Sequence, residues 1–233
     1  MNHGLLKMAL GLALTLAVGS GPAAAQDGGD TKKGAKEKAV SAAPQCPMSD
    51  EPANLAISVA TDEGPVFFCC KGCISEYQAE PKKYAAKVAA QRKALASRDR
   101  IQVTCPVSRE TVDQAVFVES NGQQVYFCCK DCVGKYQRNP DKYRSALANS
   151  YTYQTKCPVM DEEIDPKVLT TTAGGQNIYF CCKGCDKKFV KNPSKYAPRL
   201  VAQGYSLTPA DMKPAKKVDK AHEGHDHDHD HGH

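Results

Sequence analysis

Cysteine is the residue type with the most evident chemistry in this 233-residue sequence, and its 12 copies follow one pattern three times. Each repeat has a Cys-Pro pair, 22 or 23 residues between that cysteine and the next, and then a Cys-Cys-x-x-Cys cluster. We call the four cysteines of each repeat, in chain order, the first, the second, the middle and the third; the middle one is the second cysteine of the Cys-Cys pair. They are Cys46, Cys69, Cys70 and Cys73; Cys105, Cys128, Cys129 and Cys132; and Cys157, Cys181, Cys182 and Cys185. This regular spacing predicts an array of three small modules.

Several thiolates that converge on one point make a soft metal site, and the spacing favours such a site. The second and third cysteines are four residues apart, which places them on one face of a helix. A hairpin between the first and second cysteines would fold the first one back toward this face. Backbone N–H groups and the dipole at a helix start favour thiolates over thiols. A module of about 45 to 50 residues also needs a staple beyond its hydrophobic core.

Two alternatives to metal binding remain open. The first is a disulfide framework, since 12 is an even number and disulfides persist in exported proteins. The second is thiol redox catalysis by the pairs Cys70/Cys73, Cys129/Cys132 and Cys182/Cys185. A disulfide between adjacent cysteines is strained, and clustered cysteines at a helix start are typical of metal or redox chemistry. We therefore favour metal binding.

The residues around the cysteines limit the ligand set. No histidine lies within the three modules, so each site is restricted to three or four thiolates, or to three thiolates with a methionine, a carboxylate or water. A tetrahedral all-thiolate set suits Zn(II), whereas thiolates with a thioether suit Cu(I). Met48 and Met160 are the candidate thioethers, but Val107 stands near the same place in module 2. The sequence therefore favours core packing for both methionines.

Apolar and β-branched runs around turn residues predict a β-hairpin between the first and second cysteines of each module. The expected strand pairs are 55–60 with 65–69, 115–119 with 123–127, and 168–172 with 177–180. Asn121-Gly122 is a strong hairpin-turn signal. The aromatic residues before each second cysteine are expected in the hairpin core rather than at the ligands.

A helix is expected to open at each cysteine cluster, for example over residues 71–79. The proline that follows, Pro81 in module 1, fits the first turn of a second helix. In module 1 this second helix is expected to run to Ala96 and to act as a helical linker. The tyrosine three residues after each proline should cover the core. The lysine after each Cys-Cys pair should face solvent rather than lower a thiol pKa.

The two ends of the chain differ in composition from the modules. Lys7, an apolar run and Ala23-Ala24-Ala25 predict a cleaved secretory signal over residues 1–25 and export to a periplasm, with no stable membrane insertion afterwards. Residues 26–44 are predicted to be a disordered linker. The modules are expected at 45–97, 103–149 and 155–203, followed by a disordered tail at 207–233. The net charge of +5 is mild and gives no basis for nucleic-acid binding.

The end of the tail alternates histidine with aspartate. Its six histidines are His222, His225, His227, His229, His231 and His233. Such a tract predicts a flexible chelator for Zn(II), Ni(II), Cu(II) or Co(II). An expression tag is the alternative, but a tag would normally be an uninterrupted histidine run, so a native tail is favoured.

A cysteine, a spacer of about twenty residues, an aromatic-Phe-Cys-x-x-x-Cys segment and then Pro-x-x-Tyr together resemble the TRASH domain and the similar YHS domain. The resemblance covers all three modules. It implies a small α+β fold of three tandem treble-clef-like modules, each with a Cys-Pro knuckle, a β-hairpin and two short helices, joined by helical linkers. It also implies that the first, second and third cysteines are metal ligands. The family does not fix the middle position, so Cys70, Cys129 and Cys182 are fourth ligands, bridging ligands or buried thiols.

The function expected from these features is binding of copper or zinc outside the cytoplasm, to buffer, store or hand over the metal. Cu(I) or Zn(II) would occupy the cysteine sites, and a metal-efflux or metallochaperone protein is a candidate partner. The family implies binding and not catalysis, and we expect no enzymatic activity. A metal- or disulfide-stapled protein-interaction scaffold and an extracytoplasmic thiol oxidoreductase remain the alternatives.

Overall fold

The computed structural model describes residues 43–215. The predicted signal at 1–25, the predicted linker as far as residue 42, and the predicted tail from residue 216 on lie outside the described residues. The described part has a small α+β fold built from short helices and two-stranded antiparallel sheets. No helix within residues 43–215 is both long enough and apolar enough to cross a membrane.

Each repeat contains the antiparallel hairpin that the sequence predicts. The pairs are β1 (Asn54–Val59) with β2 (Val66–Phe68), β4 (Asp113–Ser120) with β5 (Gln123–Phe127), and β7 (Asp165–Thr171) with β8 (Asn177–Phe180). Asn121 and Gly122 both have positive φ, at 51° and 73°. This is the backbone that a tight turn between twisted strands requires.

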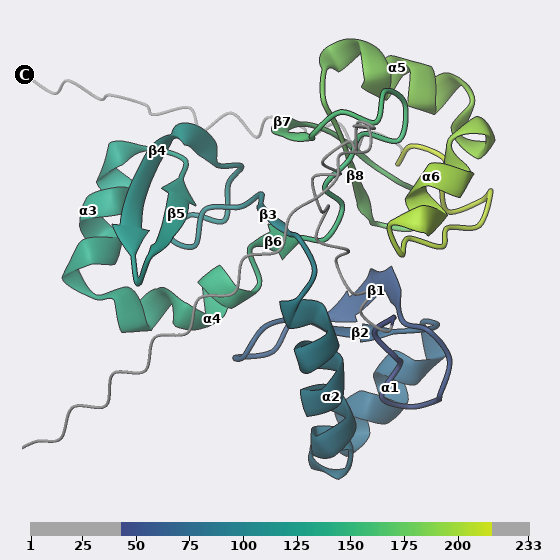
Figure 1. Ribbon diagram of the computed structural model, residues 1–233, viewed down its shortest axis with the longest axis horizontal. Coiled ribbons are helices and arrows are strands. Elements are labelled where there is room, and N and C mark those ends of the chain that lie inside the picture. The colour runs from purple at the N-terminus through teal and green to yellow at the C-terminus, as the bar shows by residue number, and fades with distance from the viewer. Residues whose placement is uncertain (1–42, 216–233) are drawn as a thin grey trace, which may run out of the picture. The chain divides into compact units, whose positions relative to one another are not determined.

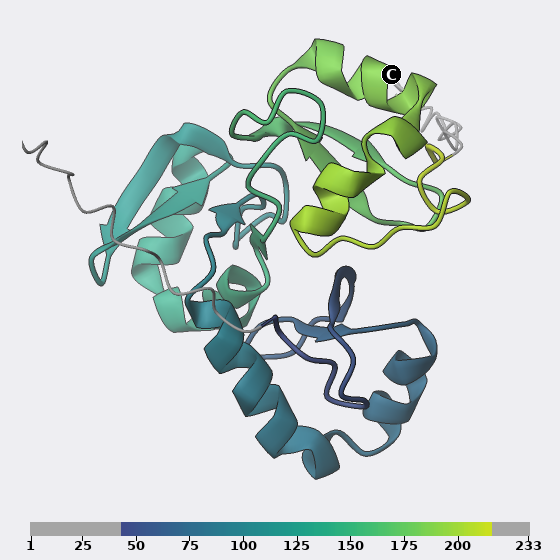
Figure 2. The ribbon, with the colours of Figure 1, turned by 45° about the vertical axis from the view of Figure 1, so that its right-hand side comes forward.

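Two helical segments follow each hairpin. The first helices are α1 (Gly72–Ala79), α3 (Lys130–Arg138) and α5 (Lys183–Lys191). The second segments open with 3-10 turns η1 (Pro81–Tyr84), η2 (Pro140–Tyr143) and η3 (Pro193–Lys195), and continue as α2 (Ala85–Ala96), α4 (Arg144–Ala148) and α6 (Ala197–Ala202). In Figures 1 and 2, α3 lies beside the β4–β5 hairpin and α5 beside the β7–β8 hairpin. The prolines stand in the first turn, as predicted.

The same aromatic stack fills the core of each module. The last residue of the second hairpin strand is a fully buried phenylalanine, and its ring centroid lies 5.2 to 5.3 Å from an aromatic ring of the first helix. The tyrosine that ends or follows the 3-10 turn lies 6.2 to 6.4 Å beyond that ring. The three stacks are Phe68–Tyr77–Tyr84, Phe127–Tyr136–Tyr143 and Phe180–Phe189–Tyr196. The expected placement of these aromatic residues is confirmed.

Helix α2 is more than the linker that the sequence predicts. It ends at Ala96 as expected, but Val88, Gln91 and Leu95 on it are buried, so it forms one wall of module 1. A two-residue ladder follows that the sequence does not predict, in which β3 (Ile101–Gln102) pairs with β6 (Tyr151–Thr152). Two residues are too few to show a strand periodicity.

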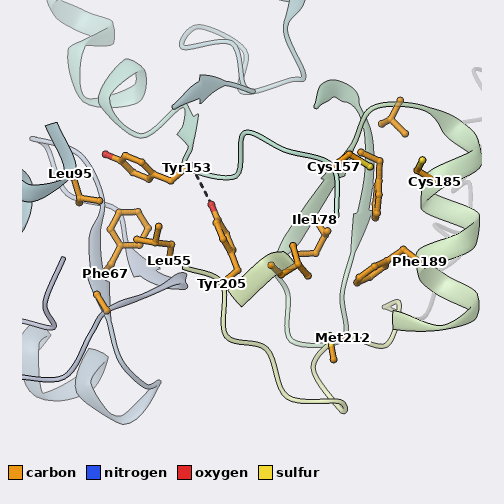
Figure 3. Packing of buried hydrophobic residues seen from close by; sticks show 14 residues of the cluster. Leu55, Phe67, Leu95, Tyr153, Cys157, Ile178, Cys185, Phe189, Tyr205 and Met212 are labelled. Carbon is orange, nitrogen blue, oxygen red and sulfur yellow. Dashed lines mark hydrogen bonds between the residues drawn. The ribbon is translucent and has the colours of Figure 1, made fainter. Parts of the chain in front are cut away.

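Modules 1 and 3 share one hydrophobic core. The ring of Phe67 meets that of Tyr153 edge-on at a centroid distance of 5.6 Å, and the N–H of Leu55 donates to the carbonyl of Gly204 at 2.8 Å. Figure 3 shows Tyr205 between these groups and the rest of the cluster, with a hydrogen bond to the N–H of Tyr153. Modules 1 and 3 are therefore not independent folding units.

The segment that begins the predicted disordered tail is ordered as far as the structure describes it. Met212 is 2% exposed and belongs to the shared core. Thr172 pairs with Pro214 in an isolated bridge, and the N–H of Ala173 donates to the carbonyl of Lys213. The predicted boundary at 207 is therefore wrong, because burial of one large side chain and these backbone contacts hold residues 207–215 against module 3.

Gly204 offers a test of the contact between modules 1 and 3. Its φ is +92°, and an added Cβ would lie 2.9 Å from Leu55 Cδ1. We expect Gly204→Ala to lower the free energy of unfolding by roughly 1 to 3 kcal/mol, because both the backbone and the contact resist the change. Chemical denaturation measures this. Gly134→Ala is the control, since Gly134 lies in α3 with no atom within 4 Å of its added Cβ, and a loss of equal size there would contradict the argument.

Candidate metal centres

The structure brings nine of the twelve cysteines together in three groups. Within each group the Sγ atoms all lie within 4.8 Å of one another, close enough to hold one metal ion. The groups are Cys46, Cys69 and Cys73; Cys105, Cys128 and Cys132; and Cys157, Cys181 and Cys185. These are the first, second and third cysteines of the three repeats. The convergence expected from the sequence is therefore present in each module.

Three different elements deliver the three thiols of a group. The first cysteine is buried on a tight turn. In module 2, the N–H of Cys105 donates to the carbonyl of Glu110 at 2.7 Å, and the N–H of Arg109 donates to the carbonyl of Cys105 at 2.8 Å. The second cysteine follows the last strand residue of the hairpin directly. The third lies in the first turn of the following helix. Figure 3 shows Cys157 and Cys185 at one end of the shared core.

A buried glutamine ties the segment before the first cysteine to the hairpin in modules 2 and 3. Gln154 is fully buried, and its side chain both accepts from the N–H of Tyr179 at 3.0 Å and donates to the Tyr179 carbonyl at 2.7 Å. The same amide nitrogen donates to the carbonyl of Lys156, the residue before Cys157, at 3.2 Å. Gln102 makes the equivalent three contacts in module 2. We call this arrangement the glutamine clamp.

Module 1 achieves the same clamp with a residue from elsewhere in the chain. Gln91, on helix α2, accepts from the N–H of Phe67 at 2.9 Å and donates to the carbonyls of Phe67 and Gln45, both at 2.7 Å. Gln45 precedes Cys46 as Lys156 precedes Cys157. None of the three clamps was predicted from the sequence. A Gln-x-x-Cys spacing at Gln102 and Gln154 was the available signal, but Ala43 stands at that place in module 1.

The middle cysteines are exposed and lie beside the groups. Sγ of Cys70 is 3.4 Å from that of Cys73, and Sγ of Cys182 is 3.5 Å from that of Cys185. In module 2, Cys129 instead approaches Cys128, at 3.7 Å. Exposure removes the expectation of buried thiols and leaves the fourth-ligand and bridging roles. All 12 cysteines are free thiols in the structure.

The first and middle thiols ionise more easily than an ordinary cysteine. Burial raises the pKa of Cys105, but N–H groups of Ser108 and Cys128 and the Ser108 hydroxyl outweigh it and bring the pKa down to about 7. Hydrogen bonds from the N–H and thiol of Cys132 lower the pKa of Cys129. The pKa of Cys70 and that of Cys182 are lowered in the same manner. The preference for thiolate expected at the helix start is thus found at the middle cysteines.

The second and third thiols have raised pKa values, which corrects the expectation for them. Burial raises the pKa of Cys132, and hydrogen bonds to Cys128 and Cys129 raise it further. Burial and neighbouring thiols also raise the pKa of Cys73 and of Cys185. Several thiolates cannot gather at one point without a compensating charge. In the metal-free state each group therefore combines an easily ionised first cysteine with a third cysteine that keeps its proton.

The low pKa of Cys105 predicts a pH dependence for the reduced, metal-free protein. Since this pKa is about 7, below the ordinary 9.0, the thiolate stabilises the fold fully above pH 9, and this contribution is lost as the pH falls through 7. Ultraviolet thiolate absorbance is expected to show an early titration step near pH 7. Cys105→Ser should reduce that step, and an unchanged titration curve in this variant would contradict the assignment.

Position within the turn that follows the first cysteine decides whether a side chain packs against the core or is exposed. Two residues after the first cysteine stand Met48, Val107 and Val159, which all pack against hydrophobic core clusters. Core packing is thus confirmed for Met48. One residue further on, Met160 is 53% exposed, so core packing is wrong for it. The lysines after the Cys-Cys pairs, Lys71, Lys130 and Lys183, are exposed as expected.

The predicted histidine ligands of the tail, His222 to His233, lie outside the described residues. Comparisons of the chain with protein-family models, with curated proteins and with solved structures found no match. The function is therefore inferred from the residues of the three groups and their geometry.

Proposed function

We propose that this protein binds Cu(I) or Zn(II) at three thiolate sites, one in each module, and that it buffers, stores or hands over the metal outside the cytoplasm. The observation that carries the proposal is the convergence of the same three cysteines, within 4.8 Å, in all three repeats. Soft thiolate sets of this kind select Cu(I) and Zn(II) among the common biological cations. The TRASH- and YHS-like spacing supports the same proposal.

The ionisation pattern gives a physical reason for a cation at each group. A first thiol with a pKa of about 7 in module 2 is ready to bind metal near neutral pH. The third thiol has a raised pKa and gives up its proton when a cation replaces it. Each group therefore exchanges protons for a metal ion, and its metal affinity should rise with pH.

The exposed middle cysteines suit transfer of the metal. A bound ion would have a buried first ligand on one side and Cys70, Cys129 or Cys182 on the solvent side. An acceptor thiol can then exchange with the exposed one, so that the ion moves without being released into water. This is how the protein would pass metal to a metal-efflux protein or metallochaperone. The histidine tail would collect Zn(II), Ni(II), Cu(II) or Co(II) nearby.

Metal analysis of two forms of the chain tests the proposal. One form runs from residue 26 to 233, and the other ends at residue 215, which keeps the buried Met212 and omits the six histidines. Both are purified reduced and without oxygen, and metal content and free thiols are measured. Three copper or zinc ions per shorter chain, with thiols released on chelation, are expected.

Other results would favour one of the alternatives. A shorter chain with no metal and no free thiols would support the disulfide-stapled scaffold. Metal that never exchanges with a chelator would support a stapled interaction module. Rapid reduction of a model disulfide by the metal-free chain would support a thiol oxidoreductase that uses Cys70 with Cys73 and its counterparts.

A further inference from the structure

The three metal groups differ at one position, three residues after the first cysteine. This position holds Ser49 in module 1, Ser108 in module 2 and Met160 in module 3. The Oγ of Ser108 lies 3.1 Å from Sγ of Cys128, and that of Ser49 lies 3.5 Å from Sγ of Cys69. In two modules, then, a hydroxyl touches the second ligand of the group. Module 3 has a thioether at the same place in the sequence.

The turns of modules 2 and 3 have the same backbone. The N–H of Arg109 donates to the carbonyl of Cys105 at 2.8 Å, and that of Asp161 donates to the carbonyl of Cys157 at 2.9 Å. Both donor residues have positive φ, at 66° and 64°. Met160 and Ser108 therefore leave the backbone in equivalent places.

Helix α6 fixes the turn that carries Met160. Nη1 of Arg199 donates to the carbonyl of Pro158 at 3.3 Å and to that of Val159 at 2.7 Å. The two carbonyls immediately precede Met160 in the chain. The backbone at this position is thus held, while the side chain itself is 53% exposed. A methionine with three rotatable bonds at a held position can turn its sulfur toward the neighbouring thiols.

The two side chains act differently on a metal group. A hydroxyl that donates to a thiolate reduces the electron density the thiolate offers to the metal. A thioether adds a soft, neutral ligand, which favours Cu(I) over the borderline Zn(II). An exposed thioether also has no hydrophobic gain to explain its place, in contrast to Met48, which packs against the core of module 1.

From this geometry we propose that Met160 is a thioether ligand that gives module 3 a preference for Cu(I) that modules 1 and 2, with Ser49 and Ser108 at this position, lack. The inference rests on the proposed function, since it assigns a metal preference to a site whose binding that proposal asserts. The three modules are then not three equal copies. Among the three modules, module 3 alone carries a thioether at this position.

The test uses the full chain and four proteins: wild type, Met160→Leu, Ser108→Met and the control Met48→Val. Leucine keeps the size of methionine without its sulfur, and valine is the residue that modules 2 and 3 carry at the control position. Cu(I) is titrated against a chromophoric Cu(I) chelator, and Zn(II) against a zinc indicator. X-ray absorption of the copper-loaded chain reports the number of sulfur ligands.

Met160→Leu is expected to weaken Cu(I) binding at one of the sites by about tenfold, with Zn(II) binding unchanged within a factor of about two. Ser108→Met should strengthen Cu(I) binding at one other site by a similar factor, and Met48→Val should change neither metal. Equal Cu(I) affinities in wild type, Met160→Leu and Ser108→Met, with metal still bound at every group, would overturn this inference and leave the proposed function intact. Absence of bound metal in all four proteins would overturn both.

Discussion

Replacing Cys105 by serine is expected to remove one metal ion of three from the chain and to abolish the cooperative unfolding of module 2 in the metal-loaded protein. Cys105 is 1% exposed, and its Sγ lies within 4.8 Å of both other thiols of its group. A structural zinc supplies about 10 to 16 kcal/mol to modules of this size at neutral pH. Loss of one of three thiolates should therefore cost more stability than any other single change in the module.

Native mass spectrometry counts the ions, and thermal unfolding followed by circular dichroism measures the stability. Cys129→Ser is the matched control, because Cys129 is exposed and stands outside the group of three. This variant should keep three ions and lose them faster to a competing thiol. The stability gap between wild type and Cys105→Ser should narrow when a strong chelator is added, to the part that the Cys105 thiolate contributes without metal. A gap of unchanged size without metal would mean that Cys105 does not stabilise the module through the metal.

Gln154→Leu is expected to lower the free energy of unfolding by about 3 to 5 kcal/mol. The substitution leaves the N–H and carbonyl of Tyr179 without the side-chain partner that they have now, while the carbonyl of Lys156 keeps a bond from Nε2 of Gln203 at 3.0 Å. Each buried polar group left unpaired costs about 1 to 3 kcal/mol. Leucine has nearly the volume of glutamine, so lost hydrogen bonds rather than a cavity would account for the change.

The clamp also makes this substitution a test of how the metal site is held. Gln154 connects the residue before Cys157 to the strand that leads to Cys181. Its loss should therefore weaken metal binding in module 3 as well as the fold. Gln137→Leu is the control, since Gln137 is exposed on α3, and it should change stability by less than about 0.5 kcal/mol. Equal losses of unfolding free energy for the two substitutions in chemical denaturation would contradict the structural role of the clamp.

The sequence predicts the cysteine groups and the hairpins because both depend on local pattern. The Asn121-Gly122 turn and the β-branched strands specify the hairpin, and the four-residue spacing of Cys128 and Cys132 brings both thiols to one side of the helix start. The ionisation of the third cysteines could not be predicted in this way. It depends on how many thiols share the point, and the spacing alone does not give the burial that raises the pKa of Cys132.

The contacts that the sequence did not reveal are those between distant segments. The clamp in module 1 joins Gln91 to Phe67 and Gln45, and a helical glutamine carries no local sign of such a role. The ordered segment at 207–215 depends on Met212 filling a place in a core contributed by modules 1 and 3. The composition of this segment is rich in polar and small residues and, taken alone, favours disorder. Tertiary burial outweighs that tendency.

The clamp glutamine comes before the cysteines in modules 2 and 3 but after them in module 1. The modules therefore differ in when each metal site can form during synthesis of the chain from its N-terminus. In modules 2 and 3, Gln102 and Gln154 precede the cysteines that they help to place, so the frame of each site can close as soon as its hairpin has emerged. In module 1, Gln91 comes 18 residues after Cys73. All four thiols of module 1 are thus synthesised before the residue that fixes their frame, and during that interval they are the part of the chain most open to oxidation or to premature metal capture.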